Sequence, residues 1–417
     1  MASRGKHLIR ADRAFATGDG PFAALFAGSF RRILDRIDEG LVEGGIDATL
    51  PDGTRRMLGG RKPGPVPIVR LHRWRALVRL VTSGSVGWYK GWAAGDWSSP
   101  DPVPLFDLFM RNGASLGGTA RAKGMWRGVN RAAHWLRRNS RSRARANIAF
   151  HYDLGNDFYR AWLDESMTYS SAIFAPGDTL EAAQARKIHA LLDRLELKPG
   201  QRLLEIGCGW GWLAEIAARD YGVEVTALTL SAEQKAYADA RLAAAGLLSQ
   251  VSVELTDYRD VRGRFDAVAS VEMVEAVGHD YWSSYLETIA RVLESGGRAA
   301  LLLISIREEL FESYAASADF IQTYVFPGGM LVSEPRFRAL AEQAGLGWQD
   351  REGFGLHYAE TLHRWRTRYD AAVEARALPA GFDERFHDLW RYYLMYCEGG
   401  FRGGGIDVAQ VTLIKKQ

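Results

Sequence analysis

The chain has 417 residues, of which 47% are hydrophobic and 25% charged, so it is long enough for two or three domains and too apolar for a disordered protein. No apolar run approaches the roughly 20 residues of a membrane-spanning helix, and no hydrophobic secretory segment follows Met1, which predicts a cytoplasmic protein. Two cysteines, Cys208 and Cys397, are too few for a disulfide framework, and the nine histidines show no zinc-binding spacing, so no metal is expected.

The first 115 residues predict short elements of mixed type. In chain order these are a helix at 22–41, strands at 46–50, 54–58 and 66–71, the segment 84–96 and a helix near 105–111. The first helix follows from apolar residues at helical period. The first two strands flank Pro51-Asp52-Gly53, whose turn chemistry predicts a hairpin. We therefore expect a small α+β domain over residues 1–115 that associates with lipid or membrane.

Residues 116–146 form a basic segment that predicts a linker between domains. No acidic residue lies between Asp107 and Asp153. The basic residues of this stretch are Arg111, Arg121, Lys123, Arg127, Arg131, Arg137, Arg138, Arg141, Arg143 and Arg145. Apolar residues such as Trp126 and Trp135 are interleaved with them, which is typical of a helix on an anionic membrane surface. A solvated linker is the alternative, and nucleic acid is not expected because no recognition motif is present.

A glycine-rich loop is the most informative feature of the chain. Leu203 to Ile206 read as an apolar strand, and Gly207, Gly209 and Gly211 follow before a helix. Glycines there let a ligand lie against the main chain. The spacing Gly-x-Gly-x-Gly differs from the dinucleotide pattern, and no Lys-Ser/Thr pair follows for nucleotide phosphates. The loop therefore favours the adenosyl cofactor of a methyltransferase.

The second half of the chain predicts an α/β fold, a Rossmann-like doubly wound sheet of the class I methyltransferase type. The expected strands are 202–206, 223–228, 251–255, 265–270 and 298–306, with a closing strand at 408–415. Ligands bind beyond the carboxyl ends of such strands, where the glycine loop, Thr229, residues 257–260 and residues 272–275 follow. Helical insertions rich in aromatic residues are expected at 311–326 and 356–400. They suit a long apolar substrate, but core packing is the usual role of aromatic residues, so their composition is only weak support for such a substrate.

Ser231 and Gln234 have the spacing of a capping box for the helix after the second strand. Starting that helix is one interpretation of these residues, and contacting a ligand is the other.

Several segments together resemble the cyclopropane fatty acid synthase family, which methylates unsaturated acyl chains of membrane phospholipids with S-adenosylmethionine. They are residues 147–159, 167–170, the glycine loop, 229–234, 320–329 and 397–402. The resemblance runs from about residue 80 to the end and implies a catalytic domain over 147–417. The resemblance also implies a peripheral membrane protein at the inner face of the cell membrane. Its substrate would be a phospholipid bilayer with unsaturated acyl chains. A homodimer is left open.

The resemblance implies roles for individual cofactor-binding residues. Gly207 and Gly209 would pack against the methionine part of S-adenosylmethionine, and Thr229 and Gln234 would lie on its ribose and adenosine side. The remaining three implied contacts are Tyr258 beside the adenine, and Tyr169 and Ser170 closing over the cofactor. Each of these residues has a purely structural alternative.

The resemblance also implies a bound bicarbonate as the base, held by a glutamate, a tyrosine, a histidine, a cysteine and main chain. The glutamate corresponds to Glu275 and the tyrosine to Tyr324. Ser171 stands at the cysteine position, where its hydroxyl can still donate to an oxyanion, and Ile304 stands at the histidine position. Ala276 follows Glu275 where histidine is frequent, and His279 is more consistent with a surface loop than with a replacement.

Methylation of a double bond makes a carbocation, and its fate sets the product. Aromatic faces stabilise such a cation, and water must be excluded from it. Proton loss from the new methyl group gives a cyclopropane, which we expect because Glu275, Tyr324 and the carboxyl-terminal motifs are present. A hydride shift and proton loss would give a methylated or methylene-bearing chain instead. Two further alternatives are a non-catalytic lipid-binding protein and a methyltransferase for a soluble small molecule.

Overall fold

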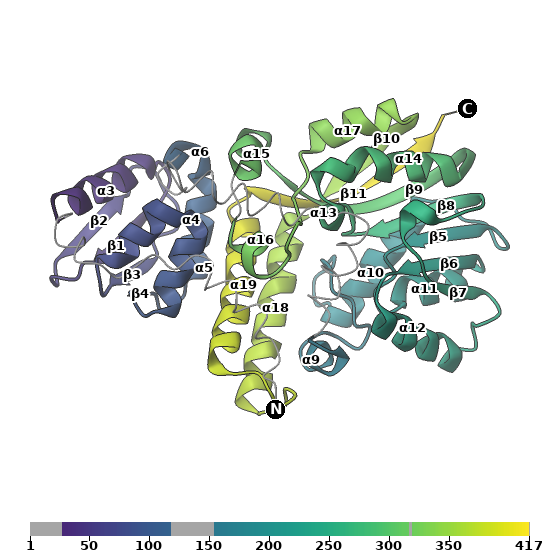
Figure 1. Cartoon of the computed structure of the whole chain (residues 1–417), viewed down its shortest axis with the longest axis horizontal. Coiled ribbons are helices and arrows are strands. Elements are labelled where there is room, and N and C mark those ends of the chain that lie inside the picture. Colours follow the sequence, from purple (N-terminus) through teal and green to yellow (C-terminus); the bar gives the residue numbers. More distant parts are fainter. Residues whose placement is uncertain (1–26, 118–153, 317–318, 417) are drawn as a thin grey trace. The chain divides into compact units, whose positions relative to one another are not determined.

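The computed structural model describes residues 27–117, 154–316 and 319–416 (Figure 1). They form two compact units. The first contains the described residues up to 117 together with 309–327 and 380–406, and the second contains 154–308, 328–379 and the segment from Asp407. Two segments that the sequence analysis placed in the catalytic domain, 309–327 and 380–406, therefore group with the amino-terminal elements. The first contains the expected insertion 311–326, whereas the second contains only the end of the expected insertion 356–400, whose residues 356–379 belong to the second unit. The expected basic segment 116–146 lies almost wholly outside the described residues.

The first unit contains a four-stranded sheet. Its strands are β1 (Gly45–Thr49), β2 (Arg55–Gly59), β3 (Ile68–Leu71) and β4 (Trp97–Ser98), in the order β2-β1-β3-β4. β1 and β2 pair antiparallel, so the predicted hairpin is confirmed. In its turn the Asp52 carboxylate accepts the Thr54 N–H at 2.9 Å, and Gly53 has φ +83°. Side-chain capping of this kind is what makes Asp-Gly a hairpin turn.

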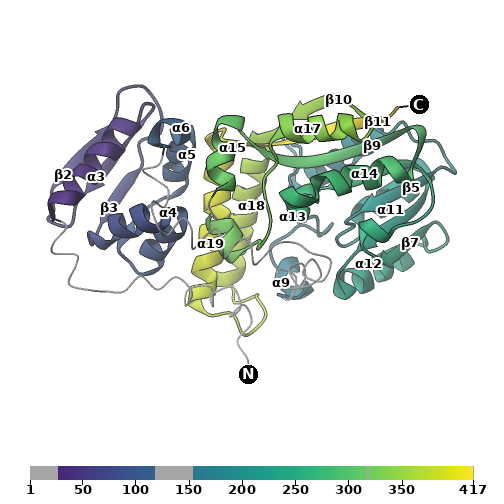
Figure 2. The same ribbon diagram turned by 45° about the horizontal axis from the view of Figure 1, so that its top comes forward.

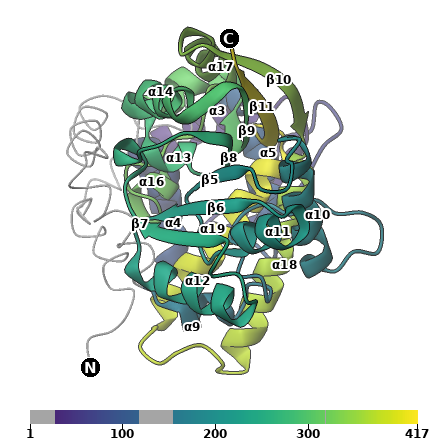
Figure 3. The same cartoon turned by 90° about the vertical axis from the view of Figure 1, so that its right-hand side faces the viewer.

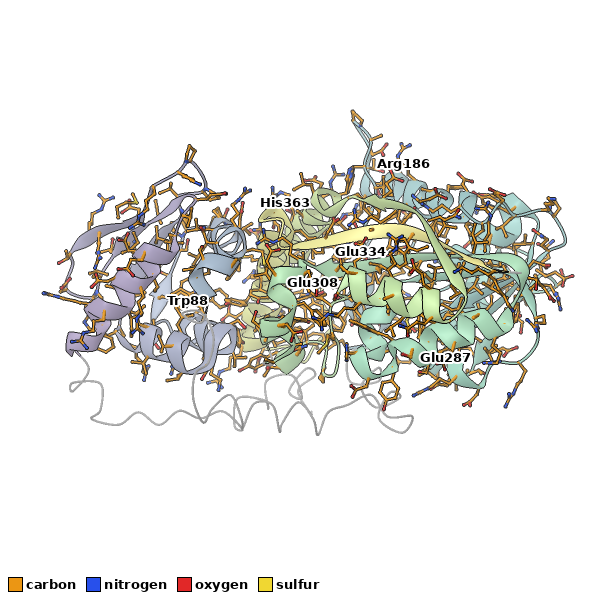
Figure 4. The ribbon with its side chains drawn as sticks, turned by 90° about the horizontal axis from the view of Figure 1, so that it is seen from above. Trp88, Arg186, Glu287, Glu308, Glu334 and His363 are labelled. Atoms are coloured by element: carbon orange, nitrogen blue, oxygen red, sulfur yellow. The ribbon has the colours of Figure 1, made fainter. Side chains whose placement is uncertain are left out.

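Helices complete the first unit. They are α3 (Ala27–Gly40), α4 (Arg75–Ala93), α5 (Val103–Arg111), α6 (Gly113–Leu116), most of α15 (Glu308–Ala315), α16 (Phe320–Tyr324) and α19 (Glu384–Arg402). α5 and α19 approach closely at Gly399, where a Cβ atom would lie 2.3 Å from the Cβ of Phe106. On α4, Trp88 stacks on Trp97 at 4.4 Å between ring centroids and is labelled in Figure 4. Close helix contacts and stacked rings thus form the core of this unit.

The second unit is built on a seven-stranded sheet of order β10-β11-β9-β8-β5-β6-β7. The strands are β5 (Arg202–Ile206), β6 (Glu224–Thr229), β7 (Val251–Leu255), β8 (Phe265–Val271), β9 (Leu293–Ile306), β10 (Leu346–Gly353) and β11 (Ile406–Lys415). β5 pairs parallel with β6 and β8, β6 with β7, and β8 with β9, whereas β10 pairs antiparallel with β11. Most residues of strands β5 and β8 are apolar and buried, as expected for parallel strands covered on both faces.

Helices alternate with these strands. They are α9 (Asn156–Arg160), α10 (Leu180–Asp193), α11 (Trp212–Tyr221), α12 (Ala232–Ala244), α13 (Val274–Val277), α14 (Trp282–Val292), α17 (Glu334–Gln343) and α18 (Gly355–Glu374), with short 3₁₀ turns η3 (Tyr258–Asp260) and η4 (His279–Tyr281). α17 lies against α14 and β10 (Figure 2), and α12 lies along β7 (Figure 3). Among the described helices none has the length and apolarity to cross a membrane.

The α/β fold class predicted from the sequence is confirmed. All six strands expected in the second half are present, two of them with the predicted bounds, 202–206 and 251–255. β10 was missed because only its first residue is buried, so it lacks the apolar pattern of a core strand.

Candidate active site

The glycine loop joins β5 to α11 with the geometry that its sequence predicts. Gly207, Gly209 and Gly211 have φ of +86°, +50° and +85°, a region that side chains disfavour. A Cβ at Gly207 would meet the Met273 side chain at 2.4 Å, so this glycine is needed for packing. A Cβ at Gly209 would meet no atom within 4 Å. The main chain at Gly209 therefore faces open space in which a ligand can lie.

Glu205, two residues before the loop, adds an unused polar atom. Its side chain is buried at the end of β5, and its Oε2 has no hydrogen-bond partner among the described residues. Burial raises the pKa of this carboxyl to about 8, against a lowering effect of Lys187. A buried carboxylate oxygen without a partner, two residues before an open glycine loop, fits a ligand that supplies N–H or O–H donors. The residues present therefore fit an adenosyl amino-acid cofactor.

Thr229 and Gln234 come together at the end of β6. The Thr229 hydroxyl donates to Gln234 Oε1 at 2.9 Å and accepts the Ser231 N–H at 3.1 Å. Ser231 Oγ accepts the Gln234 N–H at 3.2 Å, as an N-cap should. The Gln234 side chain turns to Thr229 instead of closing a capping box. Helix initiation thus accounts for Ser231, and the two predicted ligand contacts, Thr229 and Gln234, form a buried pair.

Tyr258 follows β7 and lies in the short turn η3. Its ring is buried and meets the Tyr285 ring edge-on at 5.3 Å. The Arg259 guanidinium stacks over the Tyr258 ring at 5.5 Å while pairing with Asp257 at 2.6 Å. Neighbours on two elements therefore hold the Tyr258 ring in one orientation.

Tyr169 and Ser170 belong to the segment that precedes α10. The Tyr169 ring lies among Tyr159, Trp162 and Trp365, at 5.3 to 5.6 Å between centroids. Ser170 is buried, and its Oγ accepts a hydrogen bond from Lys187 Nζ at 2.6 Å. This segment is thus held by the ring packing of Tyr169 and by the hydrogen bond from the Lys187 ammonium to Ser170.

Ser171 and Glu272 meet in a way that the sequence did not indicate. The Ser171 N–H donates to Glu272 Oε1 at 2.9 Å, and the Tyr358 hydroxyl donates to Glu272 Oε2 at 2.8 Å. The Ser171 hydroxyl, which was expected to face an oxyanion, donates to the Ala172 carbonyl at 3.1 Å. Glu272 has φ +49°, a strained value for a residue with a side chain. Burial raises the pKa of Glu272, while its two hydrogen bonds and the Lys187 charge oppose that rise.

Glu275, the predicted anion ligand, lies on α13 three residues further on. Its Oε1 accepts the Ile304 N–H, and its Oε2 is buried without a hydrogen-bond partner among the described residues. Burial, and then the nearby charge of Glu272, raise the pKa of Glu275 to about 8. Two carboxyls with raised pKa values at one strand end can exchange protons near neutral pH.

Tyr324 lies in the first unit, on α16, and is described there. Its ring is buried and meets Tyr89 at 4.9 Å and Phe320 at 5.5 Å. It is therefore part of a packed aromatic cluster. His279 lies on η4, and its side chain is 49% exposed, as expected for a loop histidine.

Sequence reasoning missed three residues of this site: Lys187, Glu205 and Glu272. Glu272 carried one signal, its position directly after a buried strand. Lys187 carried another, because it falls on the face of α10 where Leu180, Ala183 and Leu191 are buried. A lysine on an apolar helix face is a reason to look for a buried partner.

A family profile described as mycolic acid cyclopropane synthetase matches residues 139–411. The tuberculostearic acid methyltransferase of Mycobacterium tuberculosis is 38% identical over 418 residues, which cover 95% of this chain and 93% of that protein. The cyclopropane-fatty-acyl-phospholipid synthase of Escherichia coli is 35% identical over 339 residues, 80% of this chain and 84% of that protein.

Solved structures agree with these relatives. A crystal structure of a mycolic acid cyclopropane synthase complexed with SAH and CTAB is 33% identical, with a TM-score of 0.62, over 65% of this chain and 98% of that one. The seven-stranded sheet with its glycine loop is the corresponding class I methyltransferase fold. The chain therefore belongs to the mycolic acid cyclopropane synthetase family and is an S-adenosylmethionine-dependent methyltransferase of this family.

Proposed function

We propose that this protein transfers a methyl group from S-adenosylmethionine to the double bond of an unsaturated acyl chain of a membrane phospholipid and leaves a methylene-bearing, branched chain. The observation that carries the proposal is the hydrogen bond from the Ser171 N–H to the Glu272 carboxylate. In the family resemblance, a separate bicarbonate is held partly by main-chain donors. Here the N–H groups of Ser171 and Ile304 both donate to carboxylates of the chain itself.

The proposed chemistry uses these carboxylates as the base. Gly207, Gly209, Thr229, Gln234 and Tyr258 would hold S-adenosylmethionine, which would supply the methyl group. Addition to one alkene carbon leaves a cation on its neighbour. A hydride shift moves the cation to the methylated carbon. Glu272 then accepts a proton from the methyl group, and the electrons of that C–H bond form the new double bond, so no oxidant or reductant is needed. Carboxylates with raised pKa values suit proton acceptance near neutral pH.

Two further features support this assignment. Ile304, at the position where histidine was expected, provides no side-chain donor for a separate anion. The relative that matches nearly the whole chain is named for methylation to tuberculostearic acid. Tyr169 and Ser170 stay predictions as cofactor contacts, and Tyr324 and Ser171 as catalytic residues; an additional bicarbonate is not needed in this scheme.

Cyclopropane formation is the second candidate, favoured by the 35% identity with the Escherichia coli synthase. Both products add one CH₂, so mass alone does not separate them. The test is gas chromatography with mass spectrometry of fatty acids from cells that express this chain and receive a monounsaturated acyl chain, after derivatisation of the remaining double bonds. A branched product with a double bond supports the proposal. A saturated ring contradicts it, and absence of both products would leave non-catalytic lipid binding or methylation of a soluble small molecule.

A further inference from the structure

Lys187 is a buried lysine to which the proposed chemistry assigns no role. It lies on α10 with no exposed surface. Its neighbour Arg186 lies at the molecular surface (Figure 4), where its side chain is 46% exposed, and it pairs with Asp178 at 3.0 Å. Burying an ammonium is costly unless it is paired and hydrogen-bonded. The buried ammonium therefore needs hydrogen-bond and charge partners that offset the cost of removing it from water.

The first partner is the segment before α10. Lys187 Nζ donates to Ser170 Oγ at 2.6 Å, and Gln184, one turn earlier on the same helix, donates to the Ser170 carbonyl at 2.9 Å. The Lys187 carbonyl accepts a hydrogen bond from Gln410 on β11 at 2.9 Å, which ties this turn of α10 to the sheet. Ser170 is therefore held from both its side chain and its main chain, and the next residue is Ser171.

The second set of partners is electrostatic. The charged groups that face Lys187 are Glu272 after β8, Asp164 before the segment and Glu205 at the end of β5, in order of decreasing interaction. Asp164 and Glu205 are buried, and Glu272 is half-buried. Burial lowers the pKa of Lys187, and the three carboxylates oppose that fall. One ammonium thus interacts electrostatically with three carboxyls, which come from separate strand ends and loops.

We infer that Lys187 is a positioning residue: its ammonium donates to Ser170, so that the adjoining Ser171 N–H reaches Glu272, and its positive charge acts on the Glu272 carboxylate. This inference rests on the proposed function in that Glu272 is taken as the proton acceptor. In this inference the positive charge that balances the Glu272 carboxylate comes from α10, a helix of the second unit.

The first test is the pH dependence of turnover in Lys187→Met, which keeps side-chain length and removes the charge. The acceptor must be ionised, so activity rises with pH through the pKa of Glu272. Without the ammonium that pKa rises further, and the acidic limb of the profile should move to higher pH by about one unit or more. A folded variant whose acidic limb stays in place would overturn the inference.

Two matched controls lie on the same helix. Gln184→Leu removes a hydrogen bond to Ser170 and leaves the ammonium, so turnover falls without a shift of the acidic limb. Arg186→Met removes an exposed cation next to Lys187 and should leave both turnover and profile unchanged. If the acidic limb of either control shifted as far as that of Lys187→Met, the shift would result from a disturbance of α10 and not from loss of the buried charge.

The second test needs no turnover. Thermal unfolding is measured at pH 8 for Lys187→Met, Glu272→Gln and the double variant. If the two charges are paired, the double variant should melt higher than Lys187→Met, or fold where that single variant does not, because the carboxylate that interacts most strongly with the ammonium is removed together with it. Additive losses, or two variants that both fail to fold, would refute the pairing. Absence of any lipid product from the wild-type chain would instead refute the proposed function. The comparison of melting temperatures would still test the pairing of Lys187 with Glu272, because it does not depend on turnover.

Discussion

The main-chain N–H of Ser171 donates to the carboxylate of Glu272 at 2.9 Å, across 101 residues of sequence. In the proposed function, this carboxylate takes the role of the separate anion that the family resemblance implies. Glu272 adopts a left-handed backbone conformation, φ +49°, directly after β8. Strain of this size persists only where the surroundings hold it, and here Ser171 and Tyr358 do so.

Replacing Glu272 with glutamine should remove turnover and spare cofactor binding. The amide keeps the shape and one acceptor oxygen, but it cannot take a proton, so turnover should fall by about 100-fold or more. Binding of S-adenosylhomocysteine, measured by calorimetry, should change less than threefold. Glu254→Gln, on an exposed position of β7, is the control and should match the wild type in both measurements. Wild-type turnover in Glu272→Gln would show that the proton goes elsewhere.

Adding a methyl group at Gly209 tests the open space above the glycine loop. Gly209→Ala places a Cβ at φ +50°, where the left-handed strain costs about 1 kcal/mol, and puts that atom where the cofactor is proposed to lie. We expect affinity for S-adenosylhomocysteine to fall at least tenfold. Gly263→Ala carries the same kind of strain, φ +94°, with open space in a turn away from the loop. Equal affinities for the two variants would mean that the cofactor does not lie against Gly209.

The buried carboxyls predict that stability falls as pH rises. The folded-state pKa values of Glu205 and Glu275 are raised to about 8 from 4.5 by burial. Between these values the folded chain binds more protons than the unfolded chain, so this stabilisation is complete below about pH 4.5 and is lost as pH rises through 8. The melting temperature should therefore drop by several degrees from pH 6 to pH 8.5.

A variant of one of these carboxyls separates their effect from general charge effects. Glu275→Gln cannot ionise, so its melting temperature should depend less steeply on pH than that of the wild type. Glu294→Gln, whose side chain is 46% exposed, is the control and should keep the wild-type slope. Identical slopes in all three proteins would contradict the assignment.

The basic segment predicts salt-dependent membrane binding. Neutralising Arg137, Arg138, Arg141 and Arg143 should weaken sedimentation with anionic phospholipid vesicles, most strongly at low ionic strength. A control variant removes four arginines that form surface ion pairs: Arg160, Arg219, Arg336 and Arg338. It should bind vesicles nearly as well as the wild type. Equal losses in both variants would indicate a response to net charge alone.

Local signals in the sequence determined much of the second unit. The alternation of apolar runs with helical patterns predicted the parallel sheet, because strands buried on both faces are almost wholly apolar. The glycine spacing predicted the loop at Gly207 to Gly211, because only glycine adopts those torsions freely. The turn at Asp52-Gly53 predicted the hairpin for the same kind of local reason. Such signals depend on residues that are close together in the sequence, so a single amino-acid sequence is enough to detect them.

Contacts between distant residues were decided only by the tertiary structure. Lys187 reaches Ser170 across a turn and a helix, and Ser171 reaches Glu272 from another part of the chain. The insertion 311–326 and the part of the insertion 356–400 that begins at residue 380 group with the amino-terminal elements, although in sequence they lie among the strands of the sheet. Sequence periodicity shows which face of a helix or strand is buried, but not what it is buried against. The pairing of Glu272 with Ser171, and the buried ammonium beside it, therefore became visible only when the strands and α10 were packed together.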